Sequence, residues 1–235
     1  MSELNIFPDN IIDIRFQGDK SFILKKINIT SLELENQLKN EVYSGQNRVI
    51  TEEVENMKLP PFILAFYKLV FELLRIPSEI EIIEYYKKNY LTKNNDKKTY
   101  SCNYQGNTYI IENDALEGRL LRTYPSLIRD FHFYLKCKES KLFDDVKYSL
   151  HQDYFDGIDL MLKYNEKEFH ISLFVKTKRA KSFKIKKYNR HDYSNANELT
   201  LEVDLTSNSK KVSNFYLYSD SVLNEIVEKI KNETK

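Results

Sequence analysis

An aspartate and a lysine in neighbouring segments are the strongest candidates for chemistry in this chain of 235 residues. Asp159 follows Gly157 near the start of one strand-like run, and Lys176 ends the next run. Because side chains alternate between the two faces of a strand, both residues are expected on the face opposite the apolar core. A carboxylate there could bind a hard cation, and a lysine could stabilise negative charge on a reacting phosphate. The same two residues could instead form a surface ion pair that contributes little stability.

The strand-like runs that would position these residues span 158–164 and 169–176, and the polar segment 165–167 joins them. Alternate residues in both runs are apolar, which predicts a β-hairpin with one buried face. The expected core face carries Ile158, Leu160, Leu162, Tyr164, Phe169, Ile171, Leu173 and Val175. The opposite face carries Asp159, Met161, Lys163, His170, Ser172, Phe174 and Lys176.

Helices and further strands are predicted on both sides of this hairpin. A helix is expected from Asp114 past Leu135, and Pro125 should kink or split it. A strand at 146–150 precedes the hairpin. After the hairpin, the segment 180–191 fits either a helix or a strand, and its pattern favours a helix. A strand over 199–205, a strand over 215–218 and an amphipathic helix over 222–230 follow. This order predicts an α/β fold with a sheet core.

These residues resemble the core of the PD-(D/E)XK nucleases. The run Asp156-Gly157-Ile158-Asp159-Leu160, the hairpin and the strand end Val175-Lys176-Thr177 carry the resemblance. It implies a restriction-endonuclease-like mixed sheet with flanking helices in the C-terminal half. It also implies a magnesium or manganese cofactor, with Asp159 as a metal-binding carboxylate and Lys176 as the catalytic lysine. Glu117 would be the additional acid that many members carry on the first core helix.

Phe174 departs from the family pattern, which places a second acid two residues before the lysine. A phenyl ring cannot bind a cation that requires oxygen ligands. Three explanations are open. The acid has moved to Glu117, Asp156 or Glu168, or the motif aligns differently, or the site is inactive.

Charge is nearly balanced over the whole chain, with 36 Lys+Arg and 35 Asp+Glu, but it is locally segregated. From Lys176 to Arg190 there are basic residues and no acid, and Phe183, Tyr188 and His191 are interleaved with them. Lysine and arginine release counterions from nucleic-acid phosphates, so this run predicts contact with DNA. The alternative is the solvated face of a helix. The candidate DNA-binding residues after Lys176 are Lys178, Arg179, Lys181, Lys184, Lys186, Lys187 and Arg190.

Residues 1–98 are predicted to form a mainly helical or α+β region of unknown role, and residues 99–235 the nuclease-like domain. The first region carries no catalytic signature and could read DNA sequence, hold a protein partner or form a dimer interface. Its expected elements are a hairpin around Gly18, a buried helix over 62–76 opened by Pro61, a helix over 79–91 with a capping box at Ser78 and Glu81, and a linker at 93–98. A hairpin over 100–111 that turns at Gly106 follows.

Composition excludes several other classes of protein. The chain is 41% hydrophobic, and its mean hydropathy of −0.56 is typical of a soluble globular protein. Two cysteines are too few for a disulfide scaffold, and no phosphate-binding glycine motif occurs. Without a signal-like or membrane-spanning run, we expect a cytoplasmic protein that does not enter membranes.

Two functions follow from these observations. The first is a metal-dependent DNA endonuclease, by analogy from restriction, mobile-element or anti-phage biology. The alternative is a catalytically inactive nuclease-fold protein that binds nucleic acid or serves as a structural subunit of a complex, which Phe174 favours.

Overall fold

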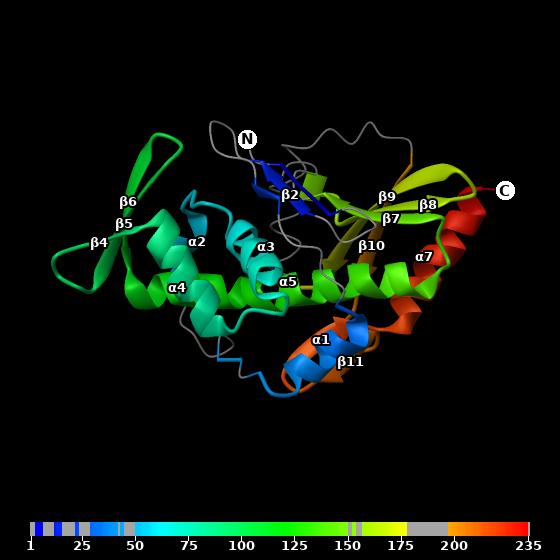
Figure 1. Cartoon of the computed structure of the whole chain (residues 1–235), viewed down its shortest axis with the longest axis horizontal. Coiled ribbons are helices and arrows are strands. Elements are labelled where there is room, and N and C mark those ends of the chain that lie inside the picture. Colours follow the sequence, from blue (N-terminus) through cyan, green and yellow to red (C-terminus); the bar gives the residue numbers. More distant parts are fainter. Residues whose placement is uncertain are drawn as a thin grey trace. The chain divides into compact units, whose positions relative to one another are not determined.

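A computed structural model describes residues 3–6, 12–15, 22–23, 29–41, 43–44, 50–149, 152–153, 157–177 and 197–234 (Figure 1). The chain divides into two compact units. Unit 1 comprises Met1–Glu33, Arg129–Val212 and Tyr216–Lys235, and unit 2 comprises Leu34–Ile128 and Ser213–Phe215. The expected boundary at residue 98 therefore falls inside unit 2.

Unit 1 is built on a mixed sheet with the strand order β10-β9-β8-β7-β1-β2-β3. The strands are β1 (Glu3–Ile6), β2 (Ile12–Arg15), β3 (Phe22–Ile23), β7 (Asp145–Ser149), β8 (Leu160–Tyr164), β9 (Lys167–Val175) and β10 (Glu198–Val203). β7, β8 and β9 form an antiparallel meander, whereas β10 runs parallel to β9. The α/β class predicted from the sequence is confirmed.

The predicted hairpin between β8 and β9 is also confirmed. Leu160 pairs with Ile171, and the turn at Asn165 and Glu166 has positive φ at both residues. Leu160, Leu162, Phe169 and Ile171 are buried, as their alternation predicts. Ser172, which belongs to the opposite face, is buried as well.

The N-terminal segment joins this sheet, which the sequence did not indicate. β1 pairs with β7 through Asn5↔Ser149 and Ile6↔Tyr148, and it pairs with β2 on its other side. The expected pairing around Gly18 is present between β2 and β3, although Gly18 itself lies outside the described residues. Assigning the first strands to a separate N-terminal region was wrong, because long-range strand pairing leaves no local sequence pattern.

Helix α5 (Asn113–Ser140) is continuous through Pro125, so the predicted split does not occur. Proline removes one backbone donor and costs stability inside a helix. Buried side chains on both sides of it, including Tyr124 and Ile128, hold the helical path. Within unit 1, α5 adds Phe133, whose ring lies edge-on to Tyr218 at 5.3 Å.

The remaining elements of the C-terminal segment are β11 (Ser209–Val212), β12 (Phe215–Tyr218) and α7 (Asp220–Glu233). β11 and β12 form a separate two-stranded sheet. Helix α7 confirms the predicted amphipathic closing helix, because it buries one apolar face. The buried residues of α7 are Val222, Leu223, Ile226, Val227 and Ile230.

Unit 2 contains the helices α2 (Glu52–Asn56), α3 (Phe62–Leu73) and α4 (Glu79–Tyr90) and the sheet β4 (Thr92–Lys93), β5 (Thr99–Tyr104) and β6 (Asn107–Glu112). The first three residues of helix α1 (Ser31–Leu38) belong to unit 1 and the rest of the helix belongs to unit 2. α3 ends earlier than predicted, because Leu74 adopts the left-handed conformation with φ of 56°. The predicted hairpin that turns at Gly106 is confirmed as β5 and β6.

The segment 93–98 is not the linker that its polarity suggested, because Lys93 ends β4 and residues 94–98 form a turn. The backbone N–H of Asn94 donates to the Thr99 carbonyl at 3.0 Å, and Asp96 accepts from the backbone N–H groups of Lys98 and Thr99. Turns and linkers favour the same polar residues, because both expose backbone groups that such side chains can bind.

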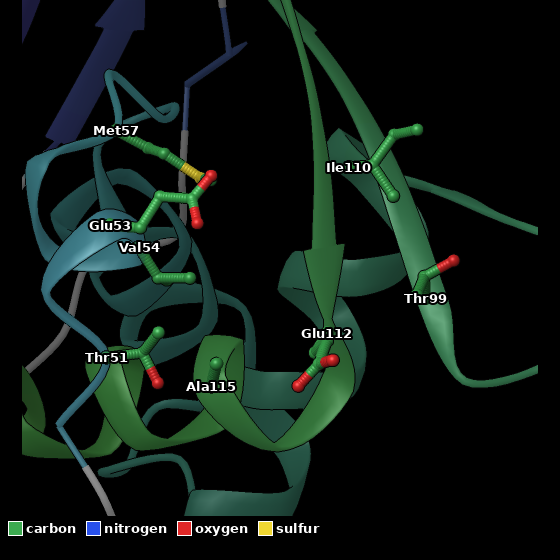
Figure 2. Close-up of a pocket in the computed structure, with 8 residues that line it drawn as sticks. All are labelled: Thr51, Glu53, Val54, Met57, Thr99, Ile110, Glu112 and Ala115. Atoms are coloured by element: carbon green, nitrogen blue, oxygen red, sulfur yellow. The ribbon is translucent and has the colours of Figure 1, made fainter.

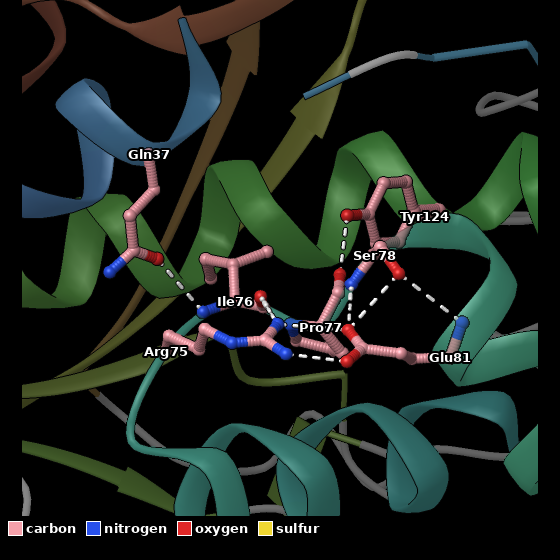
Figure 3. A network of polar contacts seen from close by, with 7 residues as sticks. All are labelled: Gln37, Arg75, Ile76, Pro77, Ser78, Glu81 and Tyr124. Carbon is pink, nitrogen blue, oxygen red and sulfur yellow. Dashed lines mark hydrogen bonds and ion pairs between the residues drawn. The ribbon is translucent and has the colours of Figure 1, made fainter. Parts of the chain in front are cut away.

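A polar network fixes the turn between α3 and α4 (Figure 3). Arg75 Nη1 donates to Glu81 Oε2 at 2.8 Å, and the Ser78 N–H donates to the same oxygen at 2.7 Å. Ser78 and Glu81 form the predicted capping box. The Tyr124 hydroxyl of α5 donates to the Pro77 carbonyl at 2.6 Å, which ties this turn to the core of unit 2.

This network predicts a pH dependence of stability. The hydrogen bonds from Arg75 lower the pKa of Glu81 from 4.5 to about 2. The unfolded chain therefore binds a proton at a higher pH than the folded chain, and stability falls as the pH drops from 4.5 towards 2. Because both side chains are more than a third exposed, we expect only about 1 kcal/mol from this pair.

Urea unfolding of the wild type and of Glu81→Gln at about pH 5 and about pH 3 measures this contribution. The free energy of unfolding of the wild type should fall more steeply than that of the variant. Equal falls would show that Glu81 does not carry the effect.

Candidate functional site

Asp159 is held at the start of β8 by two backbone contacts with β9. Its own N–H donates to the Ile171 carbonyl at 2.8 Å, and its Oδ2 accepts from the Leu173 N–H at 2.5 Å. Gly157, two residues earlier, has φ of 70°, a conformation that favours glycine. A hydrogen bond to one carboxylate oxygen fixes the orientation of the whole group, so Asp159 is a positioned acid at the sheet rim.

Lys176 directly follows β9, and its backbone N–H donates to the Val203 carbonyl of β10 at 2.8 Å. Its side chain is exposed. The pKa of Asp204 is lowered mainly by hydrogen bonds from Thr206, and the positive charge of Lys176 adds to this effect. The ammonium group therefore lies close enough to the end of β10 to influence a carboxylate there.

Asp159 and Lys176 lie at the ends of two neighbouring strands, β8 and β9, but they are offset from each other along the strand direction. Extending the observed register places Asp159 beside Ser172, and Lys176 follows four residues later. At about 3.3 Å per residue the offset is roughly 13 Å along the strand. Phe174 occupies the intermediate position on the same face. A ligand that contacts both side chains would have to extend along β9.

Ser172 and Glu198 are site candidates that sequence reasoning missed. Ser172 Oγ lies 2.8 Å from the Gly157 carbonyl and 3.2 Å from Glu198 Oε1, and it can donate its one proton to either. Glu198 reaches Ser172 because β10 lies parallel to β9, with Glu198 opposite His170. A strand over 199–205 was predicted, but no sequence signal identified its neighbour in the sheet.

Glu168, one of the predicted replacement acids, lies at the other end of β9. Its carboxylate contacts His170 Nε2 at 3.2 Å and Lys147 Nζ at 3.8 Å. Lys147 also contacts Asp145 at 3.4 Å. These partners offset the charge of Glu168. Glu168 is therefore part of a surface network of polar side chains on β7 and β9.

Glu117, the predicted acid of the first core helix, is placed in unit 2 and not in the unit that contains Asp159. Its carboxylate forms an ion pair with Lys87 at 2.6 Å and accepts from the Asn113 amide at 3.2 Å. The Lys87 ammonium lies 5.2 Å from the ring centre of Tyr100. These contacts give Glu117 a structural role between α4 and α5.

The other predicted site residues lie outside the described residues. They are Asp156, Lys178, Arg179, Lys181, Lys184, Lys186, Lys187 and Arg190, together with the predicted helix over 180–191. Among the residues that the structure does describe, no three His, Cys, Asp or Glu side chains are grouped as metal ligands. The candidate site thus consists of Asp159, Ser172, Lys176 and Glu198.

No family model matches the chain, and no curated protein matches its sequence. Within the described residues, no helix combines the length and apolar character needed to cross a membrane. The functional interpretation therefore depends on the residues and geometry of unit 1.

Proposed function

We propose that unit 1 is a metal-dependent, nuclease-like domain that hydrolyses phosphodiester bonds in DNA. The order and direction of its strands carry the proposal. A helix, α5, precedes the antiparallel meander β7, β8 and β9, and β10 lies parallel to β9. A restriction-endonuclease-like mixed sheet is consistent with this order. Asp159 precedes β8 and Lys176 follows β9, and Figure 1 shows β8 and β9 side by side with β10.

The donor atoms around Asp159 suit magnesium or manganese. The Asp159 and Glu198 carboxylates, the Ser172 hydroxyl and the Gly157 carbonyl are all oxygen donors, which hard cations prefer. We propose that Asp159 and Glu198 hold the metal, and that Glu198 replaces the acid whose expected position Phe174 occupies. A bound metal would act as a Lewis acid at the phosphate and lower the pKa of a water molecule.

The chain's own residues would position the phosphodiester. The Leu173 N–H holds the Asp159 carboxylate in one orientation. The exposed Lys176 ammonium, offset by roughly 13 Å along β9, would contact another phosphate of the same nucleic-acid backbone. The basic run begins immediately after this lysine, so its side chains would extend the positive surface along the nucleic-acid backbone.

Incubation of the full chain with supercoiled and linear DNA tests the proposal. We expect cleavage with magnesium or manganese and none with EDTA. Salt-sensitive binding without cleavage in either metal would contradict the nuclease proposal. That result would instead support the second candidate, an inactive nucleic-acid-binding protein, which Phe174 favours because it removes one oxygen ligand.

A further inference from the structure

A groove in unit 2 separates helix α2 from the outer face of the β5–β6 hairpin (Figure 2). Its volume is about 380 Å³. The residues that line it are Thr51, Glu53, Val54, Met57, Thr99, Ile110, Glu112 and Ala115. A groove of this size lies at the lower end of the range for ligand sites and can hold one or two side chains of a partner.

Two carboxylates flank the groove. Glu53 belongs to α2 and Glu112 to β6, and Figure 2 shows both among the side chains that surround the opening. Neither has a salt bridge or hydrogen bond to another side chain among the described residues. The groove therefore presents negative charge that the described part of the chain does not neutralise.

Two arginines of α5 contact α2 but not the flanking carboxylates. Arg119 Nη1 donates to the backbone carbonyls of Val54 at 2.5 Å and Met57 at 2.9 Å. Arg122 forms an ion pair with Glu55, whose side chain is mostly buried. These contacts fix α2 against α5, so neither arginine neutralises the two flanking carboxylates.

The walls between the two carboxylates are apolar. Ile110 is 68% exposed although it is a large β-branched residue, and Val54, Met57 and Ala115 complete the apolar lining. An exposed apolar surface beside charged groups is typical of a binding site for an amphipathic side chain.

We propose that this groove binds a protein partner through a basic segment in which arginine or lysine alternates with an apolar residue. The aliphatic stem of the basic side chain would pack on Ile110 and Met57, while its charged head would lie between Glu53 and Glu112. Nucleic acid does not fit, because its phosphates would face unneutralised carboxylates. This inference does not depend on the proposed nuclease activity of unit 1.

Fluorescence anisotropy with the full chain tests the proposal. The probe is a fluorescein-labelled hexapeptide that contains Arg-Leu-Arg, and the matched peptide contains Glu-Leu-Glu. We expect saturable binding of the first peptide only. The double variant Glu53→Gln/Glu112→Gln should weaken binding at least about tenfold, since charge-assisted hydrogen bonds are roughly twice as strong as neutral ones.

Glu52→Gln is the matched control, because Glu52 is exposed on the same helix but does not line the groove. It should bind the peptide as the wild type does, whereas Ile110→Ser should bind more weakly. No saturable binding, or an equal loss in Glu52→Gln, would overturn the proposal. So would duplex DNA binding that the double variant weakens. Circular dichroism of each variant verifies that it is folded.

Discussion

Replacing Asp159 by asparagine is expected to reduce metal-dependent DNA cleavage on the order of 10³-fold while DNA binding stays close to that of the wild type. On the proposed function, the substitution removes a negative charge that holds the metal. A bound metal contributes several kcal/mol to transition-state stabilisation, and each 1.36 kcal/mol corresponds to a factor of about ten in rate. Initial cleavage rates in magnesium and in manganese measure the loss.

Asparagine is a better choice than alanine because Asp159 also has a structural contact. Its Oδ2 accepts the Leu173 N–H, and an amide oxygen can accept the same hydrogen bond. Alanine would leave that partly buried N–H without its side-chain acceptor, at a cost of about 1–3 kcal/mol. A loss of activity in Asp159→Asn can therefore be assigned to the missing charge once unfolding midpoints agree.

Glu198→Gln and Glu168→Gln separate the proposed metal site from the rest of the sheet. Because Glu198 is proposed to hold the metal together with Asp159, its neutral variant should cleave DNA roughly 10²-fold more slowly, equivalent to about 3 kcal/mol. Glu168 belongs to the same sheet, on β9, but its partners are Lys147 and His170. Its variant should cleave as the wild type does. Full activity in Asp159→Asn, or an equal loss in Glu168→Gln, would contradict the proposed site.

Local sequence patterns predicted the elements that position Asp159. The alternation of apolar residues placed β8 and β9 correctly, and the polar pair at Asn165 and Glu166 marked the turn between them. The same alternation identified β10, and the Ser78 capping signal identified the start of α4. Each of these features depends on residues that are close in the chain, which is the range over which sequence periodicity is informative.

Features that depend on long-range contacts could not be predicted in this way. Nothing within β1 indicates that it pairs with β7, and nothing within β10 indicates that Glu198 reaches Ser172. Glu117 was chosen for its place on a helix, yet the local partner Lys87 determines its environment. The identity of an acid is visible in the sequence, whereas its neighbours are a property of the packing.

The largest effect on stability in unit 2 is expected from Glu55→Ala. Glu55 of α2 and Arg122 of α5 form an ion pair whose side chains are only 12% and 10% exposed. Removing the carboxylate leaves the guanidinium buried without this charge partner, which typically costs 3–5 kcal/mol. We expect a loss of about 3 kcal/mol in the free energy of unfolding, measured by urea denaturation followed through tyrosine fluorescence and circular dichroism.

Two comparisons show whether this loss arises because the Arg122 guanidinium no longer has the Glu55 carboxylate beside it. Glu72→Ala removes an exposed partner of Lys68 and should cost no more than about 0.5 kcal/mol. The double variant Glu55→Leu/Arg122→Met replaces both charges by apolar groups, and such replacements of buried pairs are often neutral. The double variant should therefore be more stable than Glu55→Ala. If instead it is less stable, contacts of Arg122 other than its ion pair with Glu55 hold α2 against α5.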